Sequence, residues 1–86
     1  MPATIMERRL IEVLQADREL AGLGCDAQGE VGNGVVVTRR GHLIAIWRWT
    51  GNTFDFVPGG YSTPTIRHAS VKAALDHTRA FVAALP

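Results

Sequence analysis

Residues 35–58 read VVVTRRGHLIAIWRWTGNTFDFVP and decide the fold. β-branched and aromatic side chains dominate this stretch, and the turn pairs Arg40-Gly41 and Gly51-Asn52 divide it into three runs. The pattern therefore predicts three antiparallel strands, over about residues 35–39, 42–50 and 53–58.

The second turn sets the register of its hairpin. Gly51 can supply the positive φ that a two-residue type II′ turn requires, so Thr50 is expected to face Thr53. The pairs then continue outward along both strands: Trp49 with Phe54, Arg48 with Asp55, Trp47 with Phe56 and Ile46 with Val57. Aromatic rings oppose aromatic rings, and opposite charges oppose each other.

Amphipathic segments flank the strands on both sides. Thr4 and Glu7 have the spacing of a capping box, which predicts a helix over about residues 4–21 that glycine ends. Ser70 is a good N-cap for a second helix over about 70–85. The glycine-rich residues 22–34 have no apolar periodicity and are predicted to be a loop, while residues 65–67 offer a short edge strand.

The resulting fold class is α+β, a single small domain of order α-β-β-β-α. We expect a three-stranded antiparallel meander with two helices packed on one face, because 86 residues suffice for one core only. The turns assign the strand residues to two faces. The aromatic face is expected to carry Val36, Thr38, Leu43, Ala45, Trp47, Trp49, Phe54 and Phe56, and the aliphatic face Val35, Val37, Ile44, Ile46 and Val57, with Arg48 and Asp55.

Two short helices can cover only one of these faces, which leaves two interpretations. In the first interpretation, the aromatic face is the core beneath the helices, and the aliphatic face is capped by the glycine-rich loop or by a second chain. Alternatively, the aromatic face is exposed and serves as a stacking platform or partner surface. Both interpretations leave apolar surface to be covered, and a homodimer covers it most simply.

Composition excludes several classes of protein. Nine basic and eight acidic side chains give a net charge of +1, far from the strongly basic balance of a dedicated nucleic-acid binder. Cys25 is the only cysteine, so neither an intrachain disulfide nor a cysteine zinc site can form. With no apolar stretch of membrane-spanning length and a charged N-terminus, we expect a cytoplasmic protein that does not enter the membrane. Its arginine-rich, lysine-poor composition suggests a bacterial source.

No group of residues has the pattern of a catalytic, metal or cofactor site. Cys25 has no surrounding nucleophile motif, and Asp76 and His77 are adjacent on a predicted helix, so their side chains diverge by about 100°. Residues 29–34 resemble a phosphate loop, but they precede a strand where such loops open a helix. We expect neither an enzyme nor a bound cofactor.

Basic residues gather around the first hairpin and mark a candidate surface for a partner or a nucleic acid. The helix-sheet-helix order resembles the double-stranded RNA-binding domain over most of the chain. That family's loop motif would fall on Arg40-Gly41-His42, which lacks the preceding Gly-Pro, and its lysine cluster would leave only Lys72 basic. The resemblance is therefore one of topology and does not imply RNA binding. The candidate surface comprises Arg39, Arg40, His42, Trp47, Arg48 and Trp49.

The sequence thus favours a small interaction module that pairs with itself, as a homodimer, or with another protein. The alternative is a weak nucleic-acid or regulatory binding protein that uses the hairpin arginines for phosphate contacts and the tryptophans for stacking.

Overall fold

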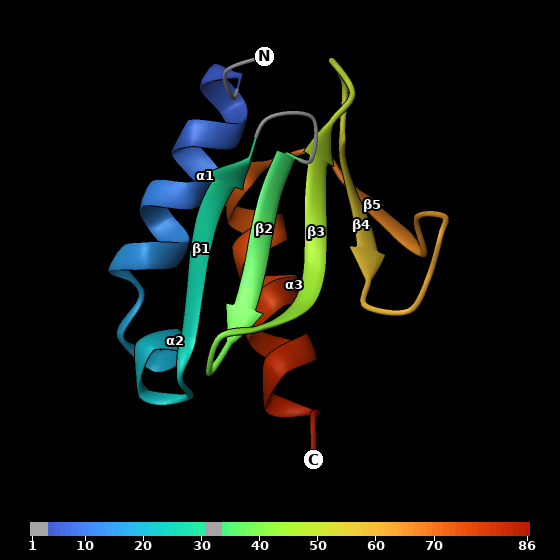
Figure 1. The fold of residues 1–86 in the computed structure, drawn as a ribbon. Coiled ribbons are helices and arrows are strands. Elements are labelled where there is room, and N and C mark those ends of the chain that lie inside the picture. The colour runs from blue at the N-terminus through green and yellow to red at the C-terminus, as the bar shows by residue number, and fades with distance from the viewer. Residues whose placement is uncertain (1–3, 31–33) are drawn as a thin grey trace.

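The computed structural model describes residues 4–30 and 34–86 (Figure 1). Its α+β fold contains three helices and one antiparallel sheet whose five strands lie side by side in chain order. The helices are α1 (Ile5–Ala16), α2 (Arg18–Gly22) and α3 (Val71–Ala83). The strands are β1 (Cys25–Glu30), β2 (Gly34–Arg39), β3 (His42–Trp49), β4 (Phe54–Pro58) and β5 (Ile66–His68).

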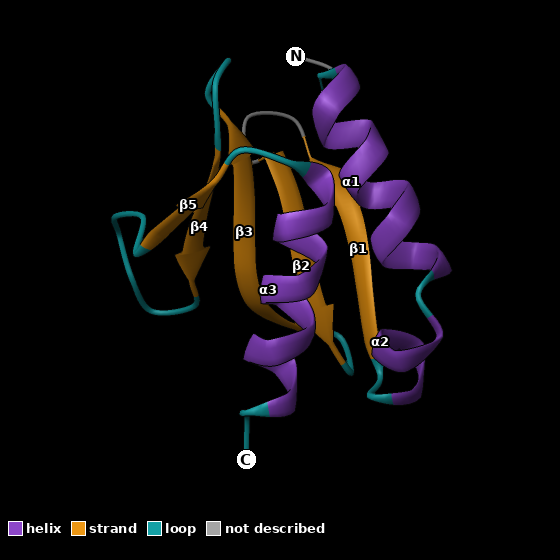
Figure 2. Ribbon diagram, turned by 180° about the vertical axis from the view of Figure 1, so that it is seen from behind, coloured by secondary structure: helices purple, strands orange, loops and turns teal. Residues whose placement is uncertain are grey.

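The helices form a single layer on one face of the sheet. Figure 2, seen from the helix side, shows α3 crossing the middle of the sheet and α1 lying along the β1 edge. The expected packing of helices on one face is thus present, with more strands beneath them than expected. Within the described residues, no helix is long and apolar enough to cross a bilayer.

The first helical segment is two helices and not the continuous helix expected over residues 4–21. Asp17 interrupts it, because its extended backbone ends α1 and its side chain caps α2 by accepting a 3.0 Å hydrogen bond from the Leu20 amide. The predicted capping box is confirmed. Thr4 and Glu7 exchange backbone and side-chain hydrogen bonds of 3.0 and 3.1 Å.

The prediction of a loop over residues 22–34 was wrong for Cys25–Glu30, which form β1. This strand pairs along its whole length with β2, and among its side chains from Cys25 to Gly29 only Ala27 is buried. The outer edge of β1 is held by α1, since the Gln15 side-chain amide donates to the Ala27 carbonyl at 2.6 Å. The rest of the predicted loop that precedes β2, residues 31–33, lies outside the described residues.

The register of the second hairpin is confirmed pair by pair, from Trp49 opposite Phe54 to Ile46 opposite Val57. Gly51 has a φ of 102°, and the Thr50 amide donates to the Thr53 carbonyl at 2.9 Å across the turn. The three predicted strands are present as β2, β3 and β4, within one residue at each end. The edge strand expected at residues 65–67 is β5, and Ser70 caps α3 as predicted.

A β-bulge overturns the face assignment of the first hairpin. Val37 pairs with Ala45 but Thr38 pairs with Leu43, so Ile44 has no partner on β2. Because one extra residue inverts the alternation, Val35 and Val37 join the aromatic face and are buried, whereas Val36 and Thr38 leave it. Within β3, Ile44 packs against the core and Leu43 is 52% exposed, the reverse of the expectation.

Gly51→Ala should lower the free energy of unfolding by roughly 1 kcal/mol or more, because alanine resists the positive φ of this turn. Urea denaturation measures the difference. Gly22→Ala is the matched control, since Gly22 ends a helix at ordinary φ and an added Cβ meets no atom within 4 Å. Equal stability of the two variants would contradict the turn geometry.

Candidate functional site

The structure separates the six residues of the predicted partner surface into four places. Trp47 is 0% exposed and lies in the core beneath the helices. Trp49 is half-buried against Phe54, with ring centroids 4.8 Å apart. Arg48 lies exposed on the opposite face of the sheet, and Arg39, Arg40 and His42 lie at the far end of the first hairpin.

Trp47 is the centre of a buried aromatic cluster. Its ring lies 4.6 Å from Phe56 and 5.7 Å from His77, centroid to centroid, and its Nε1 donates a 2.9 Å hydrogen bond to Thr78 Oγ1. Thr78 in turn donates to the Ala74 carbonyl at 2.7 Å. The indole is thus fully partnered within the core, so Trp47 cannot stack on a base or another external ring.

Thr78→Val keeps the volume of the side chain but leaves the buried indole N–H without an acceptor. We expect a loss of about 1–3 kcal/mol in the free energy of unfolding, measured by urea denaturation. Thr65→Val, an exposed threonine, is the control and should stay within about 0.5 kcal/mol of the parent chain. A Thr78→Val protein as stable as the control would show that the indole hydrogen bond contributes nothing.

Two histidines face each other beside this cluster. His68 on β5 and His77 on α3 have ring centroids 5.2 Å apart, and His68 Nε2 is buried without a hydrogen-bond partner among the described residues. Burial, and to a lesser extent His68, lowers the pKa of His77 below its ordinary value of 6.5. In the described residues no three histidine, cysteine or acidic side chains gather as a metal site would require.

Because folding favours neutral His77, its contribution to stability is complete above pH 6.5 and is lost as the pH falls below that value. The urea midpoint should therefore drop between about pH 7 and 5.5, before carboxylates titrate. His77→Phe should flatten this decline, and the exposed His42→Gln should leave it unchanged. The same decline in both variants would rule out His77 as its source.

Contacts within the fold also account for the shifted pKa values of Asp17 and Cys25. A hydrogen bond from Arg79 lowers the pKa of the Asp17 carboxyl, against the effect of burial, and ties α2 to α3. Burial raises the pKa of the half-buried Cys25 thiol, with Arg39 partly opposing it. Because the thiolate is the reactive form of cysteine, a raised pKa makes Cys25 a weaker nucleophile at neutral pH.

The face of the sheet away from the helices, here called the open face, is the largest candidate surface. Its central row is Val36, Ile46 and Val57, which are cross-strand neighbours and alternate with buried residues. In Figure 1 no helix or loop of the described residues lies in front of the middle of β2, β3 and β4, the strands that carry this row. The described side chains of the open face are Asp26, Gln28, Val36, Thr38, Leu43, Ile46, Arg48, Asp55, Val57 and Arg67.

Charged side chains flank the apolar row on the open face. Asp55, only 9% exposed, accepts from Thr53 Oγ1 at 3.0 Å and pairs with Arg67 at 3.3 Å. Arg67 therefore forms the ion pair with Asp55 that was expected of Arg48. Arg48 lies opposite Asp55 on the neighbouring strand, but its side chain is exposed. Arg67 was not predicted as the partner of Asp55 because the sequence assigned no pairing register to the expected edge strand.

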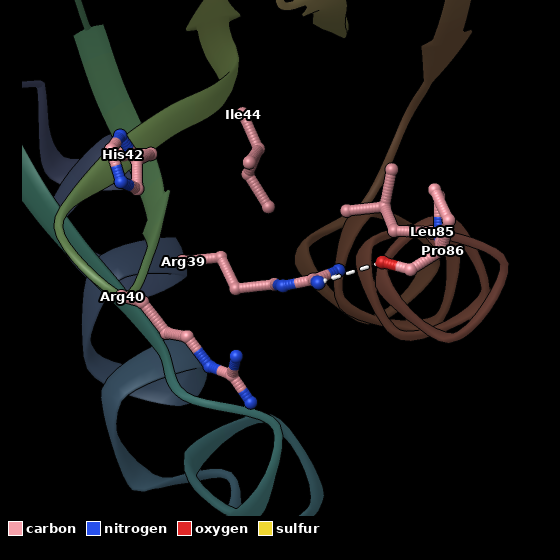
Figure 3. A pocket seen from close by; sticks show the side chains of 6 residues that line it. All are labelled: Arg39, Arg40, His42, Ile44, Leu85 and Pro86. Carbon is pink, nitrogen blue, oxygen red and sulfur yellow. Dashed lines mark hydrogen bonds between the residues drawn. The ribbon is translucent and has the colours of Figure 1, made fainter.

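The second candidate surface is a cavity at the end of the first hairpin (Figure 3). It combines hairpin residues that were expected at a partner surface with Leu85 and Pro86. No local sequence pattern could have shown that these two residues lie beside the hairpin. It has a volume of about 460 Å³ and is lined by Arg39, Arg40, His42, Ile44, Leu85 and Pro86.

Comparison with known proteins assigns neither surface a role. No family model, curated protein sequence or solved structure matches this chain.

Proposed function

We propose that this chain is a small interaction module that pairs with a second copy of itself through the open face. The observation that carries the proposal is the row Val36, Ile46 and Val57, which no described element covers. Leu43, 52% exposed, extends the apolar surface along β3. Contiguous apolar surface rimmed by charge is typical of a protein interface.

The row is symmetric about the central strand, which favours a second copy as the partner. β3 is the middle of the five strands, and Ile46 has a valine on either side, Val36 on β2 and Val57 on β4. A two-fold axis parallel to β3 therefore places Ile46 on Ile46 and Val36 of one copy on Val57 of the other. Such a self-complementary contact is the geometry of an isologous dimer.

The charges of the open face restrict how two copies can pair. Among the described side chains of this face, Asp26 and Asp55 are matched in number by Arg48 and Arg67. The same two-fold axis that places Ile46 on Ile46 also places Arg48 on Arg48, because both residues lie on β3. Asp55 of the other copy lies one strand away, so each Arg48 side chain must turn toward that carboxylate and away from its counterpart.

Nucleic-acid binding is less well supported by the geometry. Its stacking groups would be Trp47, which is buried, and Trp49, which is half-buried against Phe54. Arg48 lies on the other face of the sheet from the indole of Trp47, so the proposed basic and aromatic contacts cannot act on one strand of nucleic acid together.

Sedimentation equilibrium should find twice the 9.3 kDa chain mass at tens of micromolar. Ile46→Lys and Leu43→Lys each place a charge in the apolar surface and should weaken association at least roughly tenfold. Leu43→Lys tests the proposal if Ile46→Lys fails to fold, because Leu43 is already half-exposed.

Ile5→Lys is the matched control. Ile5 is 70% exposed on α1, on the helix side, and its substitution should leave the dimer intact. A parent chain that remains at 9.3 kDa up to millimolar concentration would refute the proposed function. So would a dimer that is unaffected by both open-face substitutions.

A further inference from the structure

The cavity at the end of the first hairpin lies on the helix side of the sheet, away from the open face. The β-bulge turns Ile44 toward this side, and the last turn of α3 brings Leu85 near it. Figure 3 shows Arg39 reaching from the hairpin toward Pro86, with Ile44 and Leu85 beside its path. A volume of about 460 Å³ lies within the range of roughly 300–1,000 Å³ that small-molecule sites occupy.

The lining combines an apolar wall with basic groups and contains no acidic side chain. Ile44, Leu85 and Pro86 form the wall, and Arg39, Arg40 and His42 supply the polar groups. A ligand that fills this space must offer apolar surface to the wall and acceptor oxygens to the guanidinium groups.

The positive charge of the cavity is not neutralised by a side chain. None of the ion pairs between described residues involves Arg39 or Arg40, whereas Arg67, Lys72 and Arg79 all pair with carboxylates. Arg39 Nη2 donates a 2.8 Å hydrogen bond to a backbone oxygen of Pro86, which uses one of the five N–H donors of a guanidinium. Donors thus remain for an anion at the edge of the apolar wall.

We propose that this cavity binds a small amphipathic carboxylate, a short acyl or aryl chain that carries one carboxylate group. The apolar chain lies against Ile44 and Leu85, and the carboxylate accepts hydrogen bonds from the guanidinium groups of Arg39 and Arg40. The site does not depend on self-association, since it lies on the opposite side of the sheet from the open face.

Titration of the ¹⁵N-labelled protein with octanoate tests the proposal by amide chemical shifts. Saturable shifts are expected at Ile44 and Leu85, and not at Val36 or Ile46 on the open face. Acetate lacks the chain and octanol lacks the charge, so each should bind about tenfold more weakly than octanoate.

The substitution Arg40→Gln should weaken octanoate binding about tenfold, because this side chain is exposed and only ligand contacts are lost. Arg9→Gln, an exposed arginine on α1, is the control and should bind as the parent does. Arg39 is left in place because it also holds Pro86.

Three results would overturn the proposal. Octanol binding as tightly as octanoate would remove the role of charge, and acetate binding as tightly would remove the role of the wall. Shifts confined to the open face, or no saturation at about 10 mM octanoate, would show that the cavity takes no such ligand. Each of these results is independent of whether the chain dimerises.

Discussion

The burial of Trp47 is the constraint on which the arrangement of the molecule depends. Its indole N–H must find an acceptor once it leaves water, and Thr78 on α3 provides one. That hydrogen bond fixes how α3 lies across β3, and the rings of Phe54 and Phe56 fill the space around it. Because the helices are needed on this face, the aliphatic side chains of the other face are left without cover.

The parts of the fold that sequence predicts well are those set by residues close together in the chain. The Thr4 and Glu7 capping box, the Ser70 cap and the Gly51 turn each involve contacts over three residues, and all are present. β1 could not be predicted in this way. Ala27 is its fully buried side chain between Cys25 and Gly29, and the strand is held by backbone pairing with β2 and by Gln15 of α1, contacts that leave no apolar pattern in its sequence.

Both candidate surfaces depend on the β-bulge at Ile44, which no local sequence pattern indicates. The bulge at Ile44 adds one residue to β3, and this alone moves Val36 and Leu43 to the open face and Ile44 to the helix side. The alternation of residues 42–49 is compatible with either arrangement, so sequence could identify the surplus of apolar side chains but not their positions. The cavity was further hidden because Arg39 and Pro86 meet across 47 residues.

The bulge also keeps the two surfaces apart. Leu43 and Ile44 are neighbours in the chain, yet Leu43 belongs to the open face and Ile44 to the wall of the cavity. A second copy seated on the open face would leave the cavity accessible, because the sheet and its backbone hydrogen bonds stand between them. The sheet thus acts as a partition, and a small chain with one buried core can present two surfaces of different chemistry without either blocking the other.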